Sequence, residues 1–414
     1  MKIAIVGAGI SGLATAHLLD SHHQVSVFEA AGYAGGHTNT IRVDTPHETH
    51  HVDTGFIVFN DRNYPGFERL LARLRVASQP SEMSFSVSDG RGDFEYNGSS
   101  PNGLFAKRAH LVTPWFHRML ADLARFNRSA RELLQTDGDG PSLGHWLESQ
   151  HFSRPFVDRL IVPQASAVWS ADPHQMWSFP ARFMAEFFAN HGMLGLRDRP
   201  QWRTIRGGSA RYVEALVSAL DGRLRLNTPV THITRSDDGV LLTPGDGEPE
   251  PFDEVVIATH SDQALAMLAD ASDREREILR AIPYQHNEAV LHTDTGMLPR
   301  RRRAWASWNY HLSTPAQNRT TVTYHMNRLQ SLRAEREFCV TLNRTAEIDP
   351  ATIIRRIDYA HPVFTAAGIR AQTQVADVSG QRRTHYAGAY WGWGFHEDGV
   401  VSARRVAERF GVTL

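Results

Sequence analysis

Three glycines near the start of the chain have the spacing of a phosphate-binding turn. Gly7, Gly9 and Gly12 stand in the order Gly-x-Gly-x-x-Gly, and Glu29 follows about 20 residues on, as such a site requires. The first glycine permits a tight turn, the second lets the backbone approach a pyrophosphate, and the third lets a helix pack against the strands. An acid in the place of Glu29 accepts hydrogen bonds from ribose hydroxyls and disfavours a 2′-phosphate. These residues predict a dinucleotide site, to which we also assign Ser11.

The elements that must position these residues surround them in the sequence. Residues 3–6 form a continuously apolar run, which is typical of a buried parallel strand. Residues 13–19 predict a helix with an apolar face, and residues 25–28 predict a second strand that ends at Glu29. The helix would present free backbone N–H groups and its positive dipole end to the phosphates.

A second glycine-rich loop follows the second strand. Gly35, Gly36, His37 and Thr38 stand where a simple NAD-binding domain would continue to another crossover helix. Glycines let the backbone come close to a second part of a long, extended cofactor. FAD is such a cofactor, and we assign these four residues to its site.

With these two loops the chain resembles the amine oxidase and phytoene desaturase superfamily of FAD enzymes. That superfamily usually has arginine after its second glycine pair, where this chain has His37. The resemblance implies that the backbone of Val230 contacts adenine. It also implies that the final helix, expected from Val400 to Arg409, directs its N-terminus at the flavin pyrimidine, where its dipole would stabilise reduced flavin. The residues that match this last motif are Gly394, Asp398, Gly399 and Val400.

Longer matching segments of the sequence point to a narrower group within this superfamily. The segments 35–40, 323–327, 340–343 and 394–399 resemble a group of bacterial NAD/FAD-binding flavoproteins, which is similar to the N-terminal half of plant cyclopropane fatty acid synthases. The resemblance implies an α/β fold in which a Rossmann-like FAD-binding domain carries an inserted α+β substrate domain, as in two-domain amine oxidases. The expected segments are 1–75, 201–262 and 376–414 for the FAD-binding domain, and 76–200 and 263–375 for the substrate domain.

Aromatic residues of the first insert suggest a wall for an apolar substrate. Trp177 precedes a helix predicted after Pro180, and that helix carries Phe183, Phe187 and Phe188. These side chains are either ordinary core or the lining of an apolar tunnel. A long acyl chain gains about 0.8 kcal/mol for each methylene that it buries in such a tunnel.

Candidates for contact with the flavin or the substrate lie in motif-like segments beside glycine or aromatic residues. They are His325, Tyr390, Trp391 and His396. Each can face the flavin or be hydrogen-bonded within the scaffold. Many amine oxidases place a lysine near flavin N5, but the two lysines of this chain, Lys2 and Lys107, do not match that position.

The bulk composition excludes several other classes of protein. The 414 residues carry a formal net charge of -1, which gives no sign of a nucleic-acid partner. The single cysteine, Cys339, lies far from the C-terminal motif, so we expect FAD to be bound non-covalently. One cysteine cannot form an internal disulfide, which fits the reducing, cytoplasmic location that we expect. We predict no metal, because no histidine group has a convincing ligand spacing. No stretch reaches the roughly 18 apolar residues of a membrane span, although the arginines at 300–303 beside Trp305 are suited to a peripheral membrane contact with anionic headgroups.

Three functions stay open at this point. The first is an FAD-dependent oxidoreductase that dehydrogenates, reduces or isomerises an apolar, lipid-like fatty acyl substrate by hydride transfer. The second is an amine oxidase, against which the missing lysine counts. The third is a non-enzymatic lipid carrier of the same fold that has lost FAD, and the intact Gly9 and Glu29 count against that loss.

Overall fold

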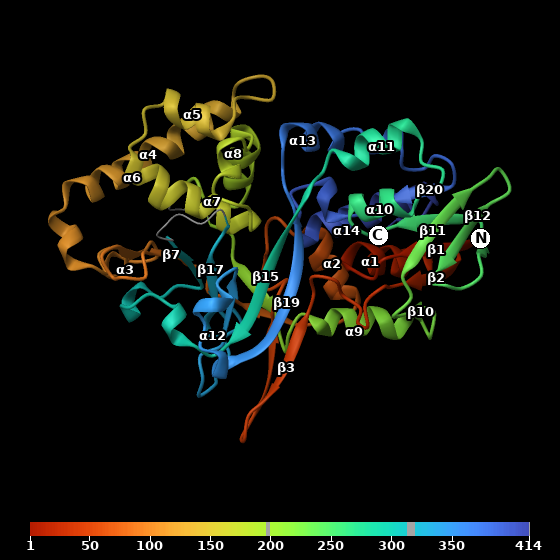
Figure 1. The fold of residues 1–414 in the computed structure, drawn as a ribbon, viewed down its shortest axis with the longest axis horizontal. Coiled ribbons are helices and arrows are strands. Elements are labelled where there is room, and N and C mark those ends of the chain that lie inside the picture. The colour runs from red at the N-terminus through yellow and green to blue at the C-terminus, as the bar shows by residue number, and fades with distance from the viewer. Residues whose placement is uncertain (196–198, 313–318, 414) are drawn as a thin grey trace.

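The computed structural model describes residues 1–195, 199–312 and 319–413. Figure 1 shows two regions: one built around a parallel sheet, where both chain ends lie, and one in which helices pack on a larger mixed sheet. In the part of the chain that the structure describes, no helix is long and apolar enough to cross a membrane.

Five parallel strands form the first sheet, in the order β10-β2-β1-β14-β20. Ile3 and Ile5 of β1 enter one hydrophobic core, whereas Ala4 and Val6 enter another. Burial on both faces explains why this strand is continuously apolar. The strands are β1 (Lys2–Val6), β2 (Gln24–Phe28), β10 (Leu224–Arg225), β14 (Glu254–Ile257) and β20 (Thr384–Tyr386).

Helices cover one face of this sheet. Nearly every residue of α1 is buried, as expected for a helix enclosed between a sheet and further helices. The helices on this face are α1 (Ile10–Leu19), α2 (Pro65–Arg73), α9 (Ala210–Ala219) and α14 (His396–Arg409).

A small antiparallel sheet and three more helices cover the opposite face. The resulting layers confirm the predicted α/β class with a Rossmann-like sheet. The small sheet contains β11 (Val230–Arg235), β12 (Val240–Pro244) and β13 (Glu250–Phe252). The helices are α10 (Ser261–Met267), α11 (Asp273–Arg280) and α13 (Ala366–Gln372).

The second region is built on a seven-stranded mixed sheet, in the order β19-β15-β18-β17-β16-β7-β8. Cys339 is fully buried in β18. The strands are β7 (Phe85–Ser88), β8 (Glu95–Asn97), β15 (Tyr284–His292), β16 (Trp308–His311), β17 (Val322–His325), β18 (Cys339–Leu342) and β19 (Ile353–Pro362).

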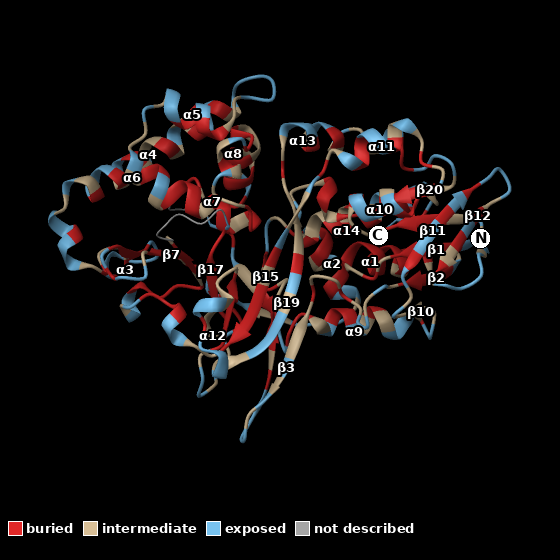
Figure 2. Ribbon diagram, in the orientation of Figure 1, coloured by how far each residue is buried: buried red, intermediate tan, exposed pale blue. Residues whose placement is uncertain are grey.

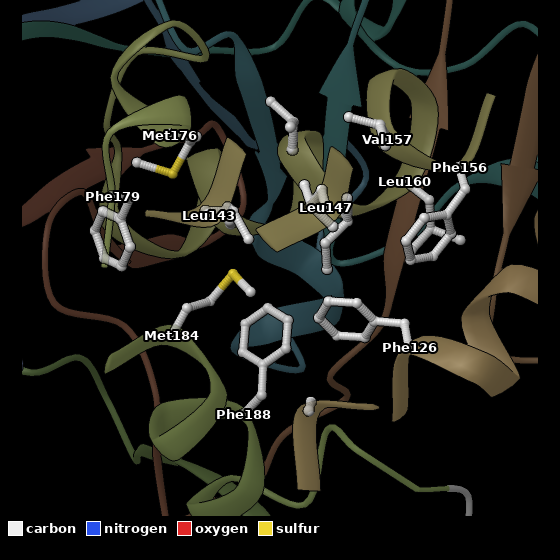
Figure 3. Packing of buried hydrophobic residues seen from close by; sticks show 14 of the residues in the cluster. Phe126, Leu143, Leu147, Phe156, Val157, Leu160, Met176, Phe179, Met184 and Phe188 are labelled. Carbon is white, nitrogen blue, oxygen red and sulfur yellow. The ribbon is translucent and has the colours of Figure 1, made fainter. Parts of the chain in front are cut away.

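Helices from the first insert pack beside this sheet around a core of their own. Figure 3 shows Phe188 of α8 pointing toward Phe126 of α4 within this core, and their ring centroids are 6.4 Å apart. Figure 2 shows the buried residues of these helices on their inner sides. The helices are α3 (Pro101–Leu104), α4 (Pro114–Leu134), α5 (Leu143–Ser149), α6 (Arg154–Phe156), α7 (Val162–Trp169) and α8 (Ala181–Asn190).

Short elements complete the described fold. They are the hairpin of β3 (Thr40–Asp44) and β4 (Thr49–Asp53), the sheet of β5 (Phe59–Asn60), β6 (Ser78–Pro80) and β9 (Trp202–Ile205), and helix α12 (Met326–Leu329).

The last helix begins earlier than the sequence predicted. It was expected from Val400, but α14 starts at His396. Asp398 explains the difference, because its carboxylate accepts a hydrogen bond from the backbone N–H of Phe395 at 2.9 Å and so caps the first turn. Gly399 is tolerated inside the helix because a Cβ there would lie 2.8 Å from Ile10 of α1.

Candidate functional site

A cavity of about 1240 Å³ runs from the parallel sheet into the second region. Its walls include Val6, Phe28 and Ala258, which lie at or just beyond the carboxyl ends of β1, β2 and β14. Open α/β sheets bind their ligands at this edge. A pocket for one small ligand is about 300–1,000 Å³, so this cavity has room for an extended cofactor and a second molecule.

The first glycine turn is shaped for a ligand. Gly7 has a φ of +103°, and a Cβ on Gly12 would lie 1.9 Å from the carbonyl oxygen of Gly7. Gly9 is different, because a Cβ there would meet no atom of the described residues within 4 Å, and the residue lines the cavity with Ser11. Gly7 and Gly12 therefore serve the turn and the packing, while Gly9 faces open space in the described structure at the N-terminus of α1.

Glu29 lies in the cavity wall beside this turn. Its carboxylate accepts hydrogen bonds from the backbone N–H groups of Ala8 at 2.7 Å and Ala31 at 2.8 Å, one on each oxygen. Each oxygen keeps a further lone pair for a ligand hydroxyl. The backbone thus fixes the carboxylate in the orientation that a ribose diol requires.

Replacing Glu29 with glutamine should weaken FAD binding by about 1–1.5 kcal/mol, because a hydrogen bond to a charged group is worth more than a neutral one. Titration of the apo-protein with FAD measures the effect. Glu248→Gln, which changes an exposed acid, is the matched control. An unchanged affinity in Glu29→Gln would mean that this carboxylate does not hold the ribose.

The second glycine loop touches the first. The backbone N–H of Gly35 donates to the carbonyl oxygen of Ala8 at 2.8 Å, and a Cβ on Gly36 would lie 3.3 Å from Cα of Gly9. Gly35 and Gly36 both line the cavity. The two loops therefore form one continuous wall.

Thr38 connects this loop to the last helix. It is buried, and its hydroxyl lies in a hydrogen-bonded cluster with Tyr212 and His396, 2.9 Å from the Nε2 atom of His396. The hydroxyl of Tyr212 lies 3.0 Å from the same nitrogen. Thr38, which the sequence assigned to the cofactor, is placed behind the described cavity wall and holds the loop against α14.

His37 belongs to a group of three cavity-lining histidines. Its ring stacks on Tyr359 at 5.0 Å and lies 5.2 Å from His361 and 6.1 Å from His260. Burial lowers the pKa of His37 and His260 to about 4 and that of His361 to about 3. The buried Nε2 atom of His37 has no hydrogen-bond partner in the described structure. A phosphate oxygen would supply that partner and would favour the protonated ring.

The C-terminal motif brings the start of α14 to the cavity. Gly394 and His396 line the cavity, and the His396 ring stacks on Phe56 with centroids 3.4 Å apart. Asp398, Gly399 and Val400 are not among the described lining residues: they cap α14 and pack it on α1. Loss of water contact raises the pKa of Asp398 to about 7. Val230, the residue assigned to adenine, lines the cavity at the start of β11.

The structure separates the four catalytic candidates. Tyr390 and His396 line the cavity, whereas Trp391 is buried beside Tyr390 without being among the described lining residues. His325 lies at the end of β17, and its Nε2 atom is 2.7 Å from the carboxylate of Glu337. That hydrogen-bonded position, outside the described lining of the cavity, gives no support to a direct contact between His325 and a cavity ligand.

Among the four aromatic candidates for the substrate wall, some line the cavity and others lie elsewhere. Phe187 lines the cavity, and Phe183 packs behind the wall on Phe364, with centroids 5.1 Å apart. Phe188 faces the helical core, and Trp177 packs at the edge of that core outside the described lining. Consecutive residues of a helix point in different directions, so Phe187 and Phe188 cannot share one wall.

Several wall residues were missed by the sequence analysis. They come from separate elements and have no common spacing, so no sequence pattern signals them. They are Trp169, Trp308, Tyr324 and Phe364.

Comparison with known proteins identifies the family. The model of the family "Flavin containing amine oxidoreductase" matches residues 10–295. An L-amino-acid oxidase of Siganus canaliculatus is 25% identical over 330 residues, which are 70% of this chain and 56% of that protein. A zeta-carotene desaturase of Synechocystis sp. is 33% identical over 210 residues, 45% of this chain and 41% of that protein. This chain thus spans about half the length of these curated relatives.

Solved structures agree on the fold. Cyclohexylamine oxidase from Brevibacterium oxydans IH-35A superposes with a TM-score of 0.72 at 17% identity, over 99% of both chains. The chain belongs to the flavin-containing amine oxidoreductase family, and FAD is its cofactor. The residues fit that cofactor, since Gly9 leaves open space, Glu29 offers free lone pairs and His37 has an unpartnered nitrogen.

Proposed function

We propose that this protein is an FAD-dependent oxidoreductase that dehydrogenates, reduces or isomerises an apolar, fatty acyl-like substrate. The observation that carries this proposal is the apolar part of the cavity beyond the glycine loops. Burial of an acyl chain against such side chains contributes about 0.8 kcal/mol per methylene. This part is lined by Leu123, Leu160, Val168, Trp169, Phe187, Met193, Trp308, Tyr324, Leu342 and Phe364.

Bound flavin would accept or donate a hydride, and the chain's own residues would position and shield the reacting groups. Burial raises the pKa of Tyr390 far above its ordinary value and lowers that of His396 far below its own. At neutral pH, Tyr390 therefore keeps its proton and His396 is uncharged. Neither group is therefore poised as a strong base.

A relative named as a zeta-carotene desaturase supports an apolar substrate. The narrower resemblance to bacterial flavoproteins similar to plant cyclopropane fatty acid synthases stays a prediction, and so does a cytoplasmic location. The lipid-carrier alternative is disfavoured, because the family is flavin-containing and the Gly9 turn is open.

An amine substrate is the second candidate. Aromatic side chains such as Tyr390 and Trp393 can hold a cation. An L-amino-acid oxidase is also among the relatives of this chain. The carboxylates among the described lining residues are Glu29, which is held at the first glycine turn, and Asp358, whose side chain is 69% exposed beside His286. The apolar part of the cavity thus offers no described acid to an ammonium group, and this favours the acyl substrate.

The test is anaerobic mixing of the oxidised protein with a panel of fatty acids and with a panel of amines. Loss of the flavin's visible absorbance reports reduction, and mass spectrometry with chromatography reports desaturated or isomerised acyl products. Acyl products, or bleaching by fatty acids, are expected. Bleaching by amines alone would overturn the proposal, whereas NAD(P)H supplied as reductant tests the reductive direction.

Two neighbouring phenylalanines offer a matched pair of variants for that assay. Both side chains belong to the helical core, but only Phe187 is among the described residues that line the cavity, so Phe187→Leu also changes the cavity wall, whereas Phe188→Leu changes the core alone. Only Phe187→Leu should alter the half-saturating concentration of the acyl substrate, and both should lose similar stability. Equal effects on half-saturation would remove Phe187 from the substrate site.

A further inference from the structure

The far end of the second region exposes two adjacent aliphatic side chains. Leu111 and Val112, in the 3₁₀ helix η1 (Arg108–Val112), are 51% and 83% exposed. This end, marked by α3 in Figure 1, lies opposite the chain termini. Each aliphatic side chain exposed to water carries a solvation cost that burial in an apolar phase would remove.

Basic residues are numerous in the segment that contains these two side chains and in the segment held beside it. The segments 89–118 and 299–305 carry eight Lys and Arg residues against three Asp and Glu, in a chain with a net charge of -1. The guanidinium of Arg303, in the 3₁₀ helix η5 (Arg302–Ala304), donates to the carbonyl oxygen of Ala106 at 2.8 Å, which holds η5 beside the residues that precede η1.

The exposed part of this face is more positively charged than the count of Lys and Arg against Asp and Glu suggests, because one of the acids is buried. The carboxylate of Glu95 is fully buried and accepts hydrogen bonds from the backbone N–H groups of Arg300 and Arg301. Arg108, Arg300, Arg302 and Arg303 are exposed. We call the surface formed by η1, α3 and η5 the docking face.

The cavity opens beside the docking face. Gly98 and Ser99 are exposed and line the cavity, and in the described part of the chain no atom would lie within 4 Å of a Cβ on Gly98. The preceding Asn97 donates its side-chain N–H to the carbonyl oxygen of Trp305 at 2.8 Å. This exposed part of the cavity wall therefore lies next to η5.

We propose that the docking face binds the surface of an anionic lipid bilayer. Leu111 and Val112 enter the headgroup boundary while the arginines contact anionic headgroups, the combination that holds peripheral proteins on membranes. A lipid-derived ligand then reaches the cavity beside Gly98 without crossing water. This last step rests on the proposed acyl substrate, whereas the docking itself does not.

Cosedimentation of the flavin-loaded protein with vesicles tests the docking. Vesicles of phosphatidylcholine mixed with phosphatidylglycerol should bind the protein, binding should weaken as salt rises, and pure phosphatidylcholine vesicles should bind far less. The double variant Leu111→Glu, Val112→Glu should lower partitioning at least about tenfold, through lost apolar burial and added negative charge. These positions are exposed, so flavin absorbance and the melting temperature should not change.

Leu241→Glu and Ile354→Glu change exposed aliphatic residues elsewhere and are the matched controls. They should bind mixed vesicles like the wild type. Wild-type protein that fails to bind mixed vesicles, binds pure phosphatidylcholine equally well, or loses binding equally in the control variants would overturn the proposal. A dimer in gel filtration that the double variant dissolves would assign the face to a second copy instead. The substrate assay contains no vesicles, so its failure is a separate result.

Discussion

Replacing Gly9 with valine is expected to remove most of the affinity for FAD while the protein stays folded. A Cβ at this position meets none of the described protein atoms within 4 Å, and the φ of −75° suits any residue. The new side chain would fill the space between α1 and the second glycine loop in which we place the pyrophosphate. Overlap of that kind should cost about 3 kcal/mol or more, roughly 150-fold in affinity. Fluorescence titration of the apo-protein with FAD measures it.

Two other glycines make this result interpretable. Gly98 also lines the cavity and also faces open space, but at the far end, so Gly98→Val should bind FAD normally. Gly12→Val should instead unfold the first βαβ unit, because a Cβ there would lie 1.9 Å from the carbonyl oxygen of Gly7. FAD affinity unchanged in Gly9→Val would show that the pyrophosphate does not lie at this turn.

The part of the site that could be predicted from sequence is the part formed by local rules. The turn from β1 to α1 depends on glycines a few residues apart, and the continuously apolar β1 depends on burial of both its faces. These constraints act between residues that are close together in the sequence. The predicted fold class is confirmed for the same reason.

The apolar wall could not be predicted, because its members meet only through tertiary structure. Trp169 ends α7, Trp308 begins β16 and Phe364 follows β19, yet all three line one cavity. Sequence reasoning instead selected a dense aromatic run in and before α8. Helical geometry then placed Phe187 in the wall and Phe188 in the core.

The histidines were similarly hard to rank. His325 and His396 both stand beside motif-like residues in the sequence. A hydrogen bond with Glu337 holds His325 at the end of β17, whereas His396 starts α14 at the cavity. His260 and His361 line the cavity beside His37, although no spacing joins them. The approach of β14, β19 and the second glycine loop creates this group.

A buried ion pair behind the parallel sheet should contribute strongly to stability. Arg235 of β11 is 1% exposed at its side chain, and its guanidinium donates to the carboxylate of Glu275 at 3.0 Å and to that of Asp270 at 2.8 Å. Tyr386 of β20 also donates to Glu275, at 2.7 Å. The pair therefore joins the small sheet, α11 and the edge of the parallel sheet.

Glu275→Gln should lower the free energy of unfolding by about 3 kcal/mol, the low end of the range for breaking a buried ion pair, because Asp270 still faces Arg235. Urea denaturation measures the change. Glu277→Gln, two residues along α11 at a side chain that is 67% exposed, is the control and should cost at most about 0.5 kcal/mol. Equal effects of the two substitutions would show that the buried pair adds nothing.

The carboxylate of Glu275 should also make the stability of the protein depend on pH in the acidic range. Despite the opposing effect of burial, which would raise it, hydrogen bonds from Arg235, the Ser272 backbone and Tyr386 lower the pKa of Glu275 from 4.5 to about 2. A carboxylate with a depressed folded-state pKa contributes stability that is fully present above its unfolded pKa and is lost as the pH falls from there through the folded value. Wild-type stability should therefore decline below about pH 4.5 more steeply than that of Glu275→Gln. Urea midpoints measured at a series of decreasing pH values should converge for the two proteins, and parallel declines would place the acid sensitivity in other carboxylates.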